Sequence, residues 1–220
     1  HRVVGGIAEL KLPSLIVIDT CTLAIEDKKR AGTLLAGVGT SFLDGAVSGN
    51  RLSVLKGRAK YFLSGERGVY EKIETALSSA LGPRLVRYVG SIGDASRLKY
   101  ILNLLVLIHN AAAAEAMALA ERAGLSLDHV YSSVYDSFAS SEVFHARARM
   151  MVDREYDQSR GGYGVARKDA GIIAAFAEAH GAPTPVFKAA LEMHYRGIEQ
   201  GFGDQDTASL FEAYLGIDTG

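Results

Sequence analysis

The chain has 220 residues, of which 48% are hydrophobic and 22% charged, as in an ordinary soluble globular protein. Its formal net charge of -1 excludes the basic excess that marks nucleic-acid-binding proteins, so we expect no nucleic-acid partner. The single cysteine, Cys21, excludes an internal disulfide framework and favours a reducing compartment such as the cytoplasm. The six histidines lack metal-site spacing, so we expect no metal.

The first part of the chain alternates apolar runs with helical stretches. Runs at residues 15–18, 42–43, 60–63 and 85–89 are short and lead into Asp or Gly, which is typical of buried strands. Helices are expected between them, at residues 26–38 and 68–80. Strand, helix and strand in this order predict a parallel, doubly wound sheet.

After residue 92 the strand pattern disappears. Asp94 can cap the start of a helix, and the chain then contains no Gly or Pro before Gly124. Glycine is common just past the end of a helix, so we expect this helix to end before Gly124. Further helices are expected at residues 126–137, 142–152, 164–179, 184–199 and 207–214. The sequence therefore predicts an α/β part over residues 1–92, followed by an all-α part over residues 93–220 that begins with a long helix.

Residues 101–120 are apolar over about the length that spans a bilayer. The segment nevertheless carries Asn103, His109, Asn110 and Glu115, and polar side chains at membrane depth are costly. We therefore expect a buried core helix and no membrane partner.

Lys99 and Asn103 are four residues apart, so both project from one face of this helix, which Val106 and Asn110 extend. A lysine beside an apolar pocket has its ammonium form disfavoured, which lowers its pKa toward the range useful for proton transfer. A neighbouring amide can orient a substrate hydroxyl. Taken alone, the pattern also fits a lysine that extends to solvent and an asparagine that packs between helices.

The segment GSIGDASRLKYILN, at residues 90–103, resembles the β-hydroxyacid dehydrogenase family, which includes 3-hydroxyisobutyrate, tartronate semialdehyde and L-threonate-type dehydrogenases. There, a glycine-rich approach to a long helix precedes a catalytic lysine, with an asparagine four residues later. The resemblance implies that Lys99 is the general acid/base and that Asn103 assists it. It also implies NAD or NADP as cofactor and a homodimer or homotetramer built through the helical part.

Four more motifs occur in the family's order along the chain. DTCT at residues 19–22 resembles a turn whose threonine lies by the cofactor, which gives that role to Thr22. DGAVSGN at residues 44–50 resembles a loop that binds the substrate carboxylate, here through Ser48, Gly49 and Asn50. RKD at residues 167–169 resembles a pair whose lysine approaches the cofactor, here Lys168, and GFGDQD at residues 201–206 resembles the family's tail.

The chain departs from the family pattern at Cys21, Ala46 and Asn50, which replace serine, proline and glycine. Asn50 adds bulk to the substrate loop, so substrate choice is expected to differ from that of common members. Cys21 has no histidine near it in sequence, and we expect a buried thiol rather than a nucleophile.

The family's opening strand and Gly-x-Gly-x-x-Gly turn do not occur in this sequence. We therefore expect an N-terminally incomplete chain: the second half of a Rossmann-type cofactor domain over residues 1–92, and a helical substrate and dimerisation domain over residues 93–220. The predicted activity is hydride transfer between a nicotinamide cofactor and a short, 3-hydroxyisobutyrate-like acid. A non-catalytic helical module and an imine reductase remain alternatives, although a lysine at position 99 argues against the latter.

Overall fold

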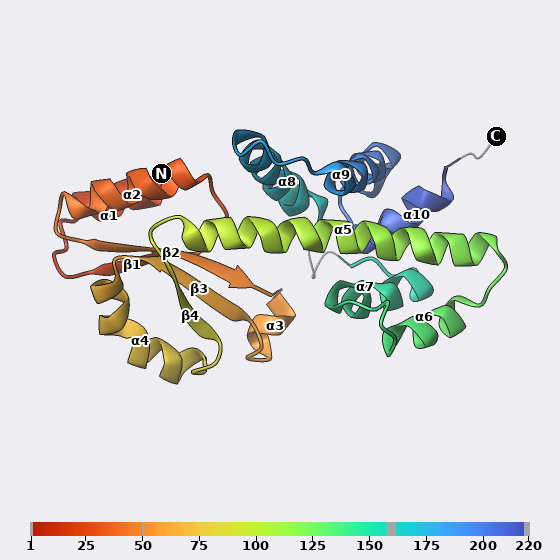
Figure 1. Ribbon diagram of the computed structural model, residues 1–220, viewed down its shortest axis with the longest axis horizontal. Coiled ribbons are helices and arrows are strands. Elements are labelled where there is room, and N and C mark those ends of the chain that lie inside the picture. The colour runs from red at the N-terminus through yellow and green to blue at the C-terminus, as the bar shows by residue number, and fades with distance from the viewer. Residues whose placement is uncertain (1, 50, 158–161, 218–220) are drawn as a thin grey trace. The chain divides into compact units, whose positions relative to one another are not determined.

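The computed structural model describes residues 2–49, 51–157 and 162–217. The chain divides into two compact units, His1–Leu102 and Asn103–Gly220. One helix, α5 (Asp94–Arg122), belongs to both units (Figure 1). The functional division after residue 92 stays a prediction.

The first unit contains a sheet of four strands in the order β1-β2-β3-β4. All four predicted strands are present, as β1 Ile16–Asp19, β2 Ser41–Ser48, β3 Lys60–Gly65 and β4 Val86–Gly90. β2 is longer than predicted, because residues 44–48, which were expected in a loop, continue the strand. Phe42 and Leu43 are both buried although neighbours in a strand point to opposite faces, which shows that both faces of the sheet are covered.

The prediction of a wholly parallel sheet is wrong at its centre. β1 pairs with β2 in parallel and β3 with β4 in parallel, but β2 and β3 are antiparallel, with Ala46 opposite Phe62. Residues 49–59 connect these two strands and hold only the short helix α3 (Arg51–Leu55). Parallel strands need a crossover of a dozen or more residues, so this link is too short to return the chain in the same direction.

Helices cover both faces of this sheet. Figure 1 shows α1 (Arg2–Glu9) and α2 (Ile25–Ala36) on one face and α4 (Arg67–Leu81) on the other. The helix α2 buries Ala31 and Leu35 and, at the same helical spacing, the charged residue Lys28. α2 and α4 were predicted within two residues at each end, whereas α1 and α3 were not predicted.

The second unit is built of helices in the part of the chain that the structure describes. After α5 come α6 Leu127–Tyr135, α7 Glu142–Asp153, α8 Tyr163–Ala179, α9 Pro185–Gly197, a π-helix Ile198–Phe202, a 3-10 helix Thr207–Ser209 and α10 Leu210–Leu215. All five predicted helices that follow α5 are present. The largest apolar core of this unit is centred on Met117, Met151 and Phe211, which are fully buried.

The long helix α5 is apolar enough to cross a membrane by length and composition. Its most apolar stretch has a mean hydropathy of 1.5, and 39% of that stretch is buried. Core helices of globular proteins meet the same criterion, so this property does not identify a membrane protein.

Candidate active site

The carboxyl ends of β1 and β2 lie at one edge of the sheet, because these strands are parallel. This edge is where open α/β sheets bind their ligands. β1 ends at Asp19, just before Thr22, and β2 ends at Ser48, just before Gly49. The first unit therefore places two predicted site segments at the edge that the fold class uses for binding.

The turn after β1 is held by side chains from inside and outside the turn. The Cys21 amide donates to Asp19 Oδ1 at 2.9 Å, and the Tyr100 hydroxyl donates to the Leu23 carbonyl. Thr22 lies half-buried between these anchors. The prediction of a buried Cys21 thiol is wrong, because this turn lies at the surface and exposes the cysteine.

Lys99 is half-buried on the first turns of α5. Its Nζ donates a hydrogen bond to the main-chain carbonyl of Val47 at 2.6 Å. Val47 immediately precedes Ser48, so the amine is directed at the end of β2 rather than into open water. Sequence reasoning did not find this partner, since a main-chain carbonyl has no signature in the residue type.

Gly49 occupies a position that admits only glycine without strain. Its φ is +141°, and a Cβ there would lie 2.9 Å from Ser53 Cβ and 3.2 Å from Ala59 Cβ. The preceding Ser48 is half-buried. The chain therefore makes a close turn directly after β2, at the residues predicted to bind the substrate carboxylate. Asn50, the third residue predicted for this loop, lies outside the described residues.

In the second unit, Asn103 and Asp169 form a side-chain pair. Asn103 Nδ2 donates to Asp169 Oδ2 at 2.7 Å, and Asp169 is only 5% exposed. The Lys168 Nζ lies 3.1 Å from Asp169 Oδ1, while the Lys168 side chain is about half exposed. Asp169 thus connects two predicted site residues, although sequence reasoning gave it no role of its own.

Asn110, predicted on the same face of α5 as Lys99 and Asn103, has a structural contact. It is buried, and its Nδ2 donates to the Thr207 carbonyl at 2.9 Å within the second unit. The tail motif at residues 201–206 is also structural. Asp206 Oδ1 accepts the Ala208 amide at 2.9 Å and the Arg147 side chain at 3.1 Å, so this carboxylate caps the 3-10 helix.

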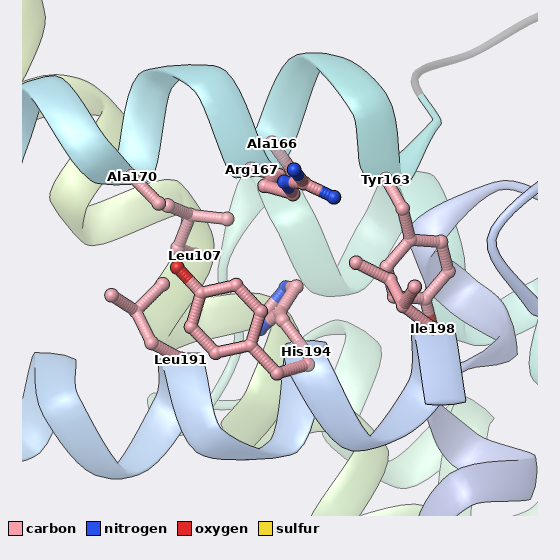
Figure 2. Close-up of a pocket in the computed structure, with 9 residues that line it drawn as sticks. Leu107, Tyr163, Ala166, Arg167, Ala170, Leu191, His194 and Ile198 are labelled. Carbon is pink, nitrogen blue, oxygen red and sulfur yellow. The ribbon is translucent and has the colours of Figure 1, made fainter. Parts of the chain in front are cut away.

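A small cavity lies between α8 and α9. Figure 2 shows Tyr163 and Arg167 reaching it from α8, and Leu191 and His194 from α9. Its volume is about 10 Å³, room for roughly one water molecule, so a hydroxy acid cannot occupy it. Burial raises the pKa of Tyr163 to about 12 and lowers the pKa of His194 below its ordinary value.

Across residues 2–49, 51–157 and 162–217, no group of three or more His, Cys, Asp or Glu side chains is placed to hold a metal ion. Among the described residues, the candidate acid/base group is Lys99.

Two family models match the chain and together span most of its length. The model described as the NAD binding domain of 6-phosphogluconate dehydrogenase matches residues 2–90. The model described as NAD-binding of NADP-dependent 3-hydroxyisobutyrate dehydrogenase matches residues 93–214.

The chain is also similar to individual dehydrogenases and reductases. The chain is 33% identical over 212 residues to an L-threonate dehydrogenase of Escherichia coli O6:H1 strain CFT073, covering 96% of this chain and 70% of that protein. It is 25% identical over 209 residues to glyoxylate/succinic semialdehyde reductase 1 of Arabidopsis thaliana, covering 95% and 71%. A crystal structure of 3-hydroxyisobutyrate dehydrogenase from Salmonella typhimurium matches with a TM-score of 0.86 at 29% identity, covering 94% of this chain and 72% of that one.

Proposed function

The chain belongs to the β-hydroxyacid dehydrogenase family and is an NAD(P)-dependent hydroxyacid dehydrogenase, and we propose that Lys99 is its general acid/base and a short β-hydroxy acid its substrate. The observation that carries this proposal is the hydrogen bond from Lys99 Nζ to the Val47 carbonyl. It holds the amine beside the Ser48–Gly49 turn. A bound acid that rests on this turn has its hydroxyl within reach of the amine.

Proton transfer then follows from this placement. In the oxidation, the Lys99 amine takes the hydroxyl proton as the hydride leaves the carbon that bears this hydroxyl. In the reduction, the Lys99 ammonium stabilises the developing alkoxide and protonates it. The Val47 carbonyl accepts from Lys99 in either direction and so keeps Nζ at one position.

Substrate orientation is assigned to Ser48, Gly49 and Asn103. The main-chain amides of Ser48 and Gly49, at a close glycine turn, are natural donors to a carboxylate. The bond from Asn103 to Asp169 fixes which way the Asn103 amide points, because one N–H is already used. Asn103 is therefore assigned to hold the substrate hydroxyl in a single orientation.

The cofactor is NAD or NADP, and the described residues fit it. Thr22 offers a hydroxyl at the carboxyl edge of two parallel strands, and Lys168 offers a partly exposed ammonium suited to phosphate. We assign both residues to cofactor binding. When bound, the nicotinamide supplies the hydride acceptor or donor, which no side chain of the chain can supply.

The preferred acid is 3-hydroxyisobutyrate-like, and L-threonate is the competing candidate because the relative at 33% identity is named for it. We also propose a cytoplasmic homodimer or homotetramer. In the second unit, α5 exposes the apolar side chains of Leu105, Val106 and Leu119, which a partner subunit would cover.

The test is an activity screen of the full-length enzyme with 3-hydroxyisobutyrate and L-threonate, each with NAD and NADP. Lys99→Ala should lower kcat about 10²–10⁴-fold on the preferred acid. The matched control is Lys72→Ala, which removes an exposed lysine of α4 and should leave kcat unchanged. Wild-type turnover in Lys99→Ala would refute the proposal.

A further inference from the structure

Lys28 is a charged residue with no exposed surface, in the first unit of the chain. Its Nζ donates to the Asp19 main-chain carbonyl at 2.7 Å and lies 3.3 Å from the Asp19 carboxylate. The Asp44 carboxylate, which is equally buried, is also 3.3 Å away. Lysine is almost never fully buried unless it is paired, so this arrangement needs a physical reason.

Asp44 connects this ammonium to the start of α5. Its carboxylate accepts the Ser96 amide at 3.0 Å and the Ser96 hydroxyl at 2.9 Å. It also accepts the Ser64 hydroxyl at 3.3 Å. One carboxylate in the middle of β2 therefore holds the first turn of the helix that carries Lys99.

The spacing relates this contact to the proposed acid/base group. Ser96 precedes Lys99 by three residues in α5, and Asp44 precedes Val47 by three residues in β2. The Asp44–Ser96 and Val47–Lys99 contacts are thus two successive links between the same strand and the same helix. A shift at the first link moves the second.

The Lys28 ammonium also contacts the end of β1, next to the turn that is assigned to cofactor binding. The Asp19 carbonyl, which Lys28 binds, is the last carbonyl of β1, and the Asp19 carboxylate fixes the turn toward Thr22 through the Cys21 amide. Lys28 is the one described side chain that contacts both Asp19 and Asp44 as an ion pair.

We propose that Lys28 is a positioning residue, whose buried ammonium holds the Thr22 turn at the end of β1 and the Lys99 helix at the middle of β2. A gain in stability is a weak explanation for this cluster, because buried ion pairs often contribute little compared with apolar side chains of similar size. One ammonium shared between two carboxylates instead fixes the positions of those two carboxylates relative to each other. The catalytic part of this inference rests on Lys99 being the acid/base group; the structural part does not.

The test compares Lys28→Met with Lys29→Met. Lys29 is the next residue of the same helix, but its side chain is 46% exposed and pairs with Glu26 at the surface. The first measurement is amide hydrogen exchange, which needs no activity. In Lys28→Met, exchange at Cys21 and Ser96 should accelerate at least about tenfold, since their acceptors have lost the cation.

The reference amide is Tyr61, which donates to the Leu85 carbonyl at 2.7 Å between β3 and β4. Its exchange should change little in Lys28→Met, and no amide should change in Lys29→Met. Equal acceleration at Tyr61, Cys21 and Ser96 would mean that Lys28 only stabilises the fold. Unchanged exchange at Cys21 and Ser96 would equally overturn the proposal.

The second measurement is kinetic. Lys28→Met should lower kcat up to about 10²-fold, as expected when a catalytic group is displaced by about 1 Å, with a smaller change in the KM of the acid. If amide exchange accelerated only at Cys21 and Ser96 in Lys28→Met while kcat stayed at the wild-type value, the link to catalysis would be overturned. If the enzyme turned over no hydroxy acid, the proposed function would fail, and the exchange pattern alone would decide the positioning role.

A double variant covers the case in which Lys28→Met does not fold. Lys28→Met combined with Asp44→Asn removes both charges, so no unpaired carboxylate stays buried at position 44, and the new amide oxygen can still accept from Ser96. This variant should fold and still have a low kcat, because the Asp19 carbonyl has lost its ammonium partner. A wild-type kcat in the folded double variant would refute the proposal.

Discussion

Asp169 accepts a hydrogen bond from the Asn103 side chain at 2.7 Å, while its other carboxylate oxygen lies 3.1 Å from the Lys168 ammonium. One buried carboxylate on α8 therefore holds an amide of α5 and a cation of its own helix. The Arg-Lys-Asp segment contributes more than the lysine that the family resemblance singled out, because its aspartate determines how Asn103 is presented.

Removing Asp169 should impair turnover through Asn103. We expect Asp169→Ala to lower kcat about 10–100-fold, because a freely rotating Asn103 amide no longer holds the substrate hydroxyl in register. Asp169→Asn should retain more activity, since its amide oxygen can still accept from Asn103 Nδ2. Steady-state kinetics of both variants, with the exposed Glu178→Gln of the same helix as control, make the comparison. Equal kcat values for wild type and Asp169→Ala would contradict this role.

The α/β-then-α order was predictable from sequence because local patterns determine it. Apolar runs before Asp or Gly gave the strands, and the absence of Gly and Pro between residues 94 and 124 gave α5. The antiparallel pairing of β2 with β3 was not predicted. Strand direction depends on the length of the connection between strands. The connection at residues 49–59 is recognised as too short for a parallel crossover only when the end of β2 and the start of β3 are known.

The site was predictable in its residue types but not in its contacts. Lys99 and Asn103 stood out through their spacing and the family resemblance, whereas the Val47 carbonyl and Asp169 did not. Lys28 could have been found, because it shares helical spacing with the core residues Ala31 and Leu35. A lysine on the buried face of a helix is a sequence signal for a buried charge.

Gly197 should tolerate no larger residue. A Cβ at this position would lie 2.7 Å from the hydroxyl of Tyr163, which is itself buried and cannot move away easily. We expect Gly197→Ala to lower the free energy of unfolding by about 1–3 kcal/mol. Denaturant unfolding measures this change.

The control for that substitution is Gly171→Ala, in the interior of α8. A Cβ there meets no atom within 4 Å, and glycine is a poor helix former. This variant should be as stable as wild type or more stable by about 0.5–1 kcal/mol. Gly197→Ala with stability equal to or above that of wild type would show that the Tyr163 contact is not restrictive.

His194 should make the enzyme less stable in acid. Burial, with a smaller contribution from Arg147, lowers its pKa below the ordinary 6.5 in the folded state. His194 Nδ1 is 2.8 Å from the Ala190 carbonyl and Nε2 is 3.5 Å from Asn110 Nδ2, an arrangement that suits a neutral ring. The unfolded chain therefore binds the proton first as the pH falls.

The His194 contribution to stability is complete above about pH 6.5 and is lost as the pH falls through the lowered pKa of the folded state, with a slope of up to about 1.4 kcal/mol per pH unit. Urea unfolding at several pH values, compared with His194→Phe, should show this step in wild type and not in the variant. An NMR titration that finds the His194 pKa at or above 6.5 would exclude this origin.

The most direct measurement of the proton-transfer role of Lys99 is the recovery of Lys99→Ala turnover by small primary amines. If the Lys99 amine exchanges a proton with the substrate hydroxyl, ethylamine and related amines added to Lys99→Ala should raise kcat in proportion to their concentration, and more strongly as their basicity rises in the oxidation direction. Lys72→Ala should show no such dependence. A Lys99→Ala enzyme that turned over at the wild-type rate without added amine would contradict the central claim.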